Sequence, residues 1–329
     1  MTFAGYLVRF RPHPDVDPRF LAYIARSAPF QHTIQAEAVS STIQNFNAER
    51  YANIRFAAPD VTHQRRIADF LDTETEHINA LTRARNSQLR CLEELWQSVL
   101  ADRAATLIAS HGVVPLRRVI TSVEQGWSPQ CDDAEASPSE WAVLKTSAVS
   151  TGTFQPLQHK RLPKEIQPDL RLRITDGDIL LTRGSGSPDL VGVAALARTE
   201  GRQLLLSDLL YRVRLRGDWS PDFVTSMLGS KPVRGLISLL LRGQSGQTIK
   251  LRAEDIKSIG VPATPTEIQP RVAGELKEMH NRIHAAQHAI HRSLAILTER
   301  RQALITAAVT GQFDVSTASG RNVTEGVTV

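Results

Sequence analysis

The sequence predicts an α+β fold in which β-rich domains are joined by two long helices that pair as a coiled coil. Three observations predict this fold. The chain matches itself after a shift of 205 positions, two segments keep a seven-residue apolar spacing, and strand-like pieces precede each of those segments. The fold is therefore expected to be an internal duplication.

The self-match is gapless over the long helical segments. It places Gln64 on Gln269, Ile67 on Val272 and Leu71 on Leu276. Further upstream, GYLVRF lies opposite LYRVRL, and DPRFLAYI lies opposite SPDFVTSM. The second copy carries Val113 to Ser207 ahead of the matched region, where the first copy carries four residues. We therefore expect the first copy to be truncated, either as a fragment that still packs at its helix or as a remnant.

The two helical segments carry apolar residues at heptad spacing, and Arg85 interrupts the first of them. At 1.5 Å per residue each helix would be roughly 60 Å long, more than a globular core needs. A helix lying along its own domain is one alternative, but two matched seams in one chain favour pairing with each other. The seam residues are Leu71, Ile78, Leu81, Leu92, Leu95, Val99, Leu276, Ile283, Ile290, Leu297 and Leu304.

These patterns divide the chain into five parts. Thr264-Pro265-Thr266-Glu267 resembles a capping box, which would start the second helix there, although Pro270 could delay the start of regular helix. A proline-bearing strand is expected at Asn53 to Pro59. The expected parts are a truncated β-rich domain at 1–61, a helix at 62–110, a complete β-rich domain at 111–264, a helix at 265–312 and a polar, disordered tail at 313–329.

Composition is that of a globular protein, with 41% hydrophobic and 22% charged residues. No apolar run reaches the roughly 18 residues of a membrane span, no signal-peptide layout begins the chain, and two cysteines suit a reducing compartment, so we expect a cytoplasmic protein. The net charge is +5, and residues 145–252 alone carry 17 Lys/Arg against 9 Asp/Glu. This local excess favours a polyanionic partner such as nucleic acid, although a merely basic surface would give the same count.

A search for catalytic chemistry finds no convincing set. His280, His284 and His288 have metal-compatible helical spacing, but the first copy has Thr75, Asn79 and Arg83 there, and a solvated polar face explains them, so no metal is expected. The glycine-rich loop at Arg183 to Ser187 lacks the Lys-Ser/Thr ending of a phosphate-binding P-loop. No methyltransferase motif, nucleophile or acid/base pair stands out, and we expect a binding protein rather than an enzyme.

Four segments together resemble the specificity subunit of type I restriction-modification systems. They are QRRIADFLDTETEHINAL after NIRFAAP, GDILLTRGSG at Gly177, SGQTIKLRAEDIKSIGVP at Ser245, and LTERRQALITAAVTGQFDV at the end of the second helix. The resemblance covers the chain up to Val315. It departs from the family pattern in the incomplete first target-recognition domain.

The resemblance implies a non-catalytic subunit with two target-recognition domains, each reading one half of a split double-stranded DNA site. It implies that the two long helices are antiparallel and hold these domains apart. It implies that methyltransferase subunits clasp the helices and that adenine N6-methylation, with S-adenosylmethionine, occurs on those subunits. A restriction subunit with motor and nuclease activity, using ATP and magnesium, would join for cleavage. No cofactor is expected on this chain itself.

Base and phosphate contacts are expected from polar loops between the strands, because Arg and Gln can contact purines bidentately and Lys and Ser more often contact phosphates. The candidates are Lys145, Thr146, Ser147, Lys160, Arg161, Arg183, Ser185, Arg242, Gln244, Ser245, Gln247 and Lys250, with Thr42 and Gln44 in the truncated copy.

Two alternatives stay open. A truncated or half-site form would bind the methyltransferase through its helices and read one DNA half-site. A more distant alternative is a coiled-coil adaptor with no DNA role.

Overall fold

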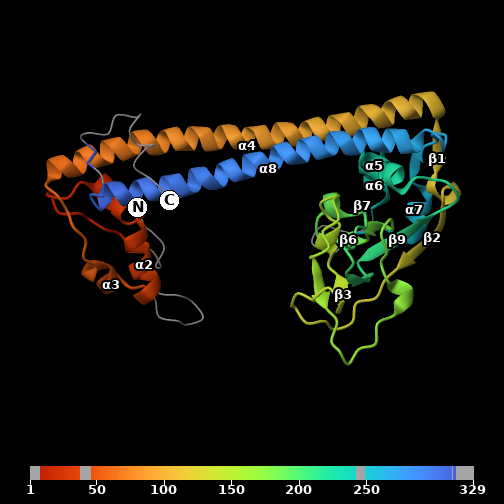
Figure 1. Ribbon diagram of the computed structural model, residues 1–329, viewed down its shortest axis with the longest axis horizontal. Helices are drawn as coiled ribbons and strands as arrows, with labels where there is room; N and C mark the ends of the chain where they lie inside the picture. Colours follow the sequence, from red (N-terminus) through yellow and green to blue (C-terminus); the bar gives the residue numbers. More distant parts are fainter. Residues whose placement is uncertain (1–7, 38–45, 242–248, 313, 316–329) are drawn as a thin grey trace. The chain divides into compact units, whose positions relative to one another are not determined.

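The computed structural model describes residues 8–37, 46–241, 249–312 and 314–315. The chain divides into two compact units, with unit 1 comprising residues 1–91 and 285–329, and unit 2 comprising residues 92–284. Two long helices, α4 (Val61–His111) and α8 (Gln269–Val309), contribute one end to each unit (Figure 1). The expected long helices are therefore present, and each unit is described by itself below.

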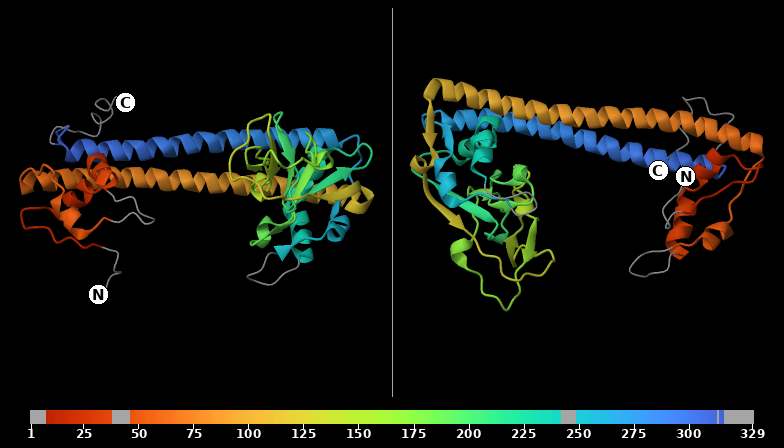
Figure 2. Two further views of the ribbon diagram at one scale, coloured as in Figure 1. Left: turned by 90° about the horizontal axis from the view of Figure 1, so that it is seen from below. Right: turned by 180° about the vertical axis from the view of Figure 1, so that it is seen from behind.

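Unit 1 is helical over its described residues. Three short helices, α1 (Pro18–Ile24), α2 (Ala28–Glu37) and α3 (Ala48–Asn53), precede α4. Phe20 of α1 is fully buried against Leu71 of α4 and Leu304 of α8. The beginning of α4 thus packs beside the end of α8, which makes the two helices antiparallel here (Figure 2).

The strand expected at Asn53 to Pro59 is not formed. Helix α3 ends at Asn53, and residues 54–60 have no regular secondary structure. The corresponding strand of unit 2, β11 (Gly260–Pro262), exists because β1 (Val113–Pro115) pairs with it in antiparallel register. No described residue of unit 1 takes the place of β1, and a lone strand has no partner for its backbone groups.

Unit 2 holds a β-rich body, as expected for the second copy. One sheet has the antiparallel order β2-β9-β5-β7, and a second has the order β4-β3-β8 with β3 and β8 parallel. Two short antiparallel pairs, β1-β11 and β6-β10, complete the body. The strands not yet bounded are β2 (Ile120–Gln125), β3 (Trp141–Leu144), β4 (His159–Arg161), β5 (Ile179–Thr182), β6 (Gly184–Ser185), β7 (Ala194–Leu196), β8 (Gln203–Leu205), β9 (Leu210–Leu215) and β10 (Ile249–Lys250).

Short helices join this body to the long ones. The α-helices are α5 (Pro221–Gly229), α6 (Lys231–Leu240) and α7 (Ala253–Ser258), and the 3-10 turns are η1 (Leu116–Arg118), η2 (Thr146–Ala148), η3 (Leu170–Leu172) and η4 (Pro188–Leu190). Phe223 of α5 shares one core with Leu100 and Ala104 of α4 and with Leu276 of α8. The end of α4 therefore packs beside the beginning of α8.

The duplication is visible as a repeated order of helices, α1-α2-α3-α4 and α5-α6-α7-α8. It is also visible in one repeated joint. Gln64, at the start of α4, accepts a hydrogen bond from the Asp17 N–H (2.9 Å) and donates to the Pro59 carbonyl (2.7 Å). Gln269, at the start of α8, accepts from the Ser220 N–H (2.9 Å) and donates to the Thr264 carbonyl (2.8 Å). Both glutamines are buried.

The start of the second helix differs from the expectation. Regular helix begins at Gln269, four residues beyond the proline of the predicted capping box. The side chain of Gln269 bonds back to the Thr264 carbonyl, so the turn before the helix is closed by this buried amide rather than by a capping box. Pro270 then lies in the first turn, where its missing N–H costs no helical hydrogen bond.

The seam of the helix pair was predicted one residue out of place at its second position. Leu81 and Leu95 are 41% and 48% exposed, so neither lies in the seam. The inner face instead carries residues four positions after Leu71 and Leu92. Thr75, four residues after Leu71, is buried, and Trp96, four residues after Leu92, is half-buried. A helical repeat of 3.6 residues places the +4 position on the inner face as readily as the +3 position.

Candidate nucleic-acid interface

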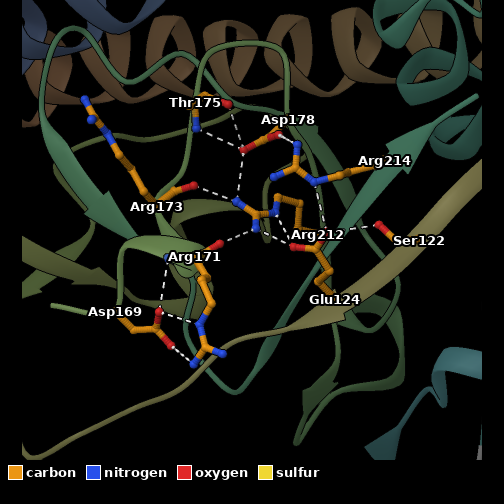
Figure 3. A network of polar contacts seen from close by, with 9 residues as sticks. All are labelled: Ser122, Glu124, Asp169, Arg171, Arg173, Thr175, Asp178, Arg212 and Arg214. Carbon is orange, nitrogen blue, oxygen red and sulfur yellow. Dashed lines mark hydrogen bonds and ion pairs between the residues drawn. The ribbon is translucent and has the colours of Figure 1, made fainter.

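A buried guanidinium on β9 is hydrogen-bonded to several segments of the β-rich body of unit 2 (Figure 3). The Arg212 side chain is only 1% exposed. It donates to the Glu124 carboxylate on β2 (Nε to Oε2, 3.0 Å) and to the backbone carbonyls of Arg171 (2.7 Å) and Arg173 (2.6 Å). The Arg212 side chain on β9 thus bonds both to β2, through Glu124, and to the backbone of residues 171–173. We call residues 171–173 the crossing segment.

The carboxylates around Arg212 are themselves hydrogen-bonded (Figure 3). Glu124 accepts from Ser122 Oγ (3.0 Å) and Arg214 Nε (2.9 Å), and Asp178 Oδ2 lies 3.5 Å from Arg212 Nη1. Burial raises the pKa of the Glu124 carboxyl, but hydrogen bonds from Arg212, Ser122 and Arg214 outweigh burial and leave that pKa lowered. A buried charge is tolerated here because its partners satisfy it.

Five sequence candidates meet where β3 and β4 pair: Lys145, Thr146, Ser147, Lys160 and Arg161. We call these residues the β3-β4 basic cluster. The pairing of Leu144 with His159 brings the end of β3 beside the start of β4, and Ser147 Oγ donates to Gln158 Oε1 (2.8 Å). Residues that lie apart in the sequence are therefore neighbours in the structure.

Acidic side chains partly neutralise this cluster. Lys145 Nζ lies 3.1 Å from Asp133 Oδ1 and Lys160 Nζ lies 4.0 Å from it, while Arg161 Nη2 lies 3.0 Å from Asp132 Oδ2. The hydrogen bond and charge of Lys145 lower the pKa of the Asp133 carboxyl, with a smaller effect of Lys160. These pairs are exposed and hence weak, so an incoming anion can replace the carboxylates at small cost.

A second group of candidates meets at the pairing of β6 with β10, which we call the β6-β10 corner. Here Lys250 lies opposite Gly184, and Ser185 lies opposite Ile249. The Arg183 guanidinium donates to Tyr211 Oη (Nε, 3.2 Å) and to the Asp208 carbonyl (Nη1, 3.3 Å). Arg183 is thus half-buried and engaged inside the fold, whereas Lys250 is exposed.

Six candidates lie outside the described residues: Thr42, Gln44, Arg242, Gln244, Ser245 and Gln247. Their proposed contacts stay predictions from the sequence.

Comparison with known proteins shows what this arrangement belongs to. The chain is 23% identical over 325 residues to the specificity subunit of the type I restriction enzyme EcoKI of Escherichia coli (strain K12), covering 95% of this chain and 69% of that protein. It is 30% identical over 163 residues to the EcoEI specificity subunit of Escherichia coli, covering 49% of this chain and 27% of that protein. No family model matches the chain.

The chain belongs to the specificity subunits of type I restriction enzymes. A solved structure described as showing complex assembly and conformational transition of the type I R-M system shares the fold, with a TM-score of 0.67 and 16% identity over 91% of this chain and 72% of that one. The expected α+β fold with long paired helices is confirmed. As a specificity subunit, the chain is not one of the catalytic subunits.

Two features of this specificity subunit were missed at the sequence level. Arg212 alternates with apolar residues on β9, a pattern typical of an outward-facing side chain, and it was not singled out from the sequence; it is buried and donates to the carbonyls of residues 171 and 173. His280 was placed on a solvated face, yet its ring lies 4.8 Å from the Trp96 ring of α4, and burial lowers its pKa, with His284 adding to the effect. The counterpart of His280, buried Thr75, is the signal that could have marked this inner position.

The described ranges of the specificity subunit contain no group of three His, Cys, Asp or Glu residues placed to hold a metal ion. Over the same ranges, no helix combines the length and apolar character that a membrane crossing requires.

Proposed function

We propose that this specificity subunit binds double-stranded DNA through the β-rich body of unit 2. The β3-β4 basic cluster carries the proposal, because strand pairing places Lys145 and Lys160 around one carboxylate, Asp133, while Arg161 pairs with the neighbouring Asp132. Residues 145–252 also hold the positive charge of the chain. Exchange of Asp132 and Asp133 for DNA phosphates would release condensed counterions and make binding depend on salt.

The β6-β10 corner would add Lys250 to the same recognition body. In this proposal Arg183 acts by holding the corner against Tyr211, since its guanidinium is already hydrogen-bonded. Backbone and side-chain contacts to phosphates would position the duplex, and polar loop residues would read base edges.

The finer role is that of a subunit for a bipartite site that also scaffolds its partners. The helix pair would carry the methyltransferase subunits, which bind S-adenosylmethionine, and a restriction subunit that uses ATP and magnesium would join them. Leu95, which is 48% exposed on the part of α4 in unit 2, would supply an apolar contact for a subunit on that helix.

A half-site form is the second candidate. One observation favours it: the described residues of unit 1 contain no strand, and so none of the sheet that positions the basic cluster in unit 2. Such a protein would hold the methyltransferase through its helices and read one half of the site.

The test is a salt titration of duplex binding, from about 50 to about 200 mM, with a random-sequence duplex of about 30 base pairs. The parent chain is compared with Lys145→Ala/Lys160→Ala and with the charge-matched control Lys231→Ala/Lys277→Ala. Each phosphate contact contributes about 0.9 to the slope of log affinity against log salt, so the cluster variant should lose about 1.8 of it and the control none.

An equal loss in both variants would remove the basic cluster from the interface. Repeating the titration with the methyltransferase subunit present separates the alternatives. Binding that stays independent of salt with and without that subunit would support an adaptor with no DNA role. Sequence-specific binding that needs only one half of a split site would support the half-site form.

A further inference from the structure

Trp127, two residues beyond the end of β2, is the tryptophan that the β-rich body leaves exposed. It is 41% exposed, whereas Trp96, Trp141 and Trp219 are partly buried and pack against the cores of unit 2. A tryptophan that becomes buried removes about 150–250 Å² of surface from water. The Trp127 indole therefore keeps much of its area available for a ligand, and its neighbours indicate the class of that ligand.

The backbone around Trp127 is fixed to the end of β8. The Trp127 N–H donates to the Leu206 carbonyl (3.0 Å). Gly126 is packed so closely that a Cβ there would stand 2.0 Å from the same carbonyl oxygen. On the other side, Ser128 Oγ accepts from the Asp208 N–H (3.1 Å). The indole is thus carried on an anchored segment, so little backbone entropy is lost when a ligand contacts it.

This anchored segment lies close to the end of β3, where the β3-β4 basic cluster begins. Strand β8 runs parallel to β3, and their pairing ends with Val143 opposite Leu205, so Lys145 and Leu206 lie at the same end of the two strands. Because Trp127 is bonded to Leu206, its backbone is about two strand spacings, roughly 10 Å, from the end of β3. That separation is smaller than the major groove of DNA, which is about 12 Å wide.

The same segment is bonded to the β6-β10 corner. Ser128 and Asp208 share a hydrogen bond, and the Asp208 carbonyl accepts from Arg183 Nη1 (3.3 Å). Arg183 directly precedes β6, whose Gly184 pairs with Lys250. The exposed indole is therefore placed within a few residues of both groups of DNA-contact candidates.

We propose that Trp127 packs its indole against the bases of the bound duplex, and so adds an apolar contact to the polar contacts of the two basic groups. The proposal rests on the DNA-binding function proposed above. An apolar side chain can contact the methyl group of thymine in the major groove, and an aromatic ring can stack on an unstacked base. Lysine is depleted at the centre of protein interfaces, so an indole flanked by lysines fits a nucleic acid better than a protein.

An indole contact and a phosphate contact respond differently to salt. A lysine that neutralises a phosphate releases condensed counterions, so its contribution to affinity falls as the salt concentration rises. The indole is uncharged and releases none. Removal of the indole should therefore weaken binding by the same factor at every salt concentration, unlike removal of Lys145 and Lys160.

The probe is the set of duplexes, about 30 base pairs long, that the full chain retains from a randomised library. Trp127→Ala should weaken binding of these duplexes about tenfold at both about 50 and about 200 mM salt, and Trp127→Phe, which keeps an aromatic ring, should stay within about threefold of the parent. The matched control is Leu239→Ala, which shortens an 82% exposed leucine on α6 of unit 2 and should leave the affinity unchanged. Far-UV circular dichroism should show the parent helix content in all three variants.

Sequencing of the retained duplexes separates base reading from general affinity. Trp127→Ala should lose the base preference that the parent shows at neighbouring positions, whereas Lys145→Ala/Lys160→Ala should keep that preference and bind all duplexes more weakly.

Equal affinities and preferences of Trp127→Ala and the parent would overturn the proposal, as would a loss of affinity that disappears at the higher salt concentration. A Trp127→Ala chain that keeps its affinity for DNA but no longer co-elutes with the methyltransferase subunit would assign the indole to a protein contact and overturn the proposal too. A parent chain that retains no duplex would refute the DNA-binding function itself. Salt-dependent binding by the parent that Trp127→Ala matches would refute the indole contact alone.

Discussion

Replacing the buried Gln269 by leucine should lower the free energy of unfolding of unit 2 much more than replacing an exposed glutamine by leucine. Gln269 is fully buried, and its amide satisfies the Ser220 N–H and the Thr264 carbonyl. Leucine keeps much of the side-chain volume but removes both hydrogen bonds. The half-buried Ser220 N–H loses a bond that contributes about 1 kcal/mol, and the buried Thr264 carbonyl left without a partner costs about 1–3 kcal/mol, so the free energy of unfolding should fall by about 2–4 kcal/mol.

All four tryptophans, Trp96, Trp127, Trp141 and Trp219, lie in unit 2. Urea unfolding followed by tryptophan fluorescence therefore reports on that unit. Gln167→Leu, at an exposed position of unit 2, is the control and should stay within about 0.5 kcal/mol of the parent.

The first copy supplies a matched experiment. Gln64→Leu should weaken protection of the Ile67 to Leu71 amides in unit 1, measured by hydrogen exchange, by a similar free energy. A Gln269→Leu change below about 0.5 kcal/mol would refute the view that this repeated joint stabilises each unit.

Three further predictions concern the β-rich body of unit 2. Arg212→Met should lower the free energy of unfolding by about 3–5 kcal/mol in urea, because it leaves the Glu124 carboxylate and two backbone carbonyls without their buried donor. A loss below about 1 kcal/mol would contradict this role. The pKa of Glu124 is lowered from its ordinary 4.5, so its contribution is present above that value and is lost as pH falls through the folded-state pKa. The parent should therefore lose stability on acidification, and its advantage over Arg212→Met should shrink; a pH-independent difference would rule this linkage out. Gly126→Ala should cost more than about 3 kcal/mol, since a Cβ there would stand 2.0 Å from the Leu206 carbonyl oxygen, and a melting temperature like that of the parent would show that the backbone can yield.

The elements with a strong repeat could be predicted from the sequence. The long helices follow from the spacing of Leu71 and Ile78 and of their counterparts Leu276 and Ile283, all of which are buried. A heptad pattern fixes one seam position but leaves the second between +3 and +4, which is why Leu81 was misplaced. The apolar run of β5, which lies within the segment GDILLTRGSG, is typical of a strand that is buried on both sides.

What could not be predicted depends on neighbours far away in the sequence. The pattern at Asn53 to Pro59 matches β11, but strand formation needs β1 beside it. The alternating pattern of β9 indicates that Arg212 faces outward. Its burial depends on the segment around Arg171, which is distant in the sequence and accepts a hydrogen bond from Arg212. Clustering of Lys145 with Lys160 depends on β3-β4 pairing, which the sequence suggested only as strands separated by loops.

The way Arg212 holds the crossing segment has a consequence for variation. The Arg212 guanidinium donates to the backbone carbonyls at positions 171 and 173. The side chains at these two positions are exposed. Every amino acid carries the same backbone carbonyl oxygen, so the side chains of this stretch can change while Arg212 keeps its hydrogen bonds. Insertion or deletion of a single residue between 171 and 173 would instead move one oxygen out of reach. Residues 171–173 can therefore be substituted, but the number of residues in this segment cannot change without loss of a hydrogen bond to Arg212.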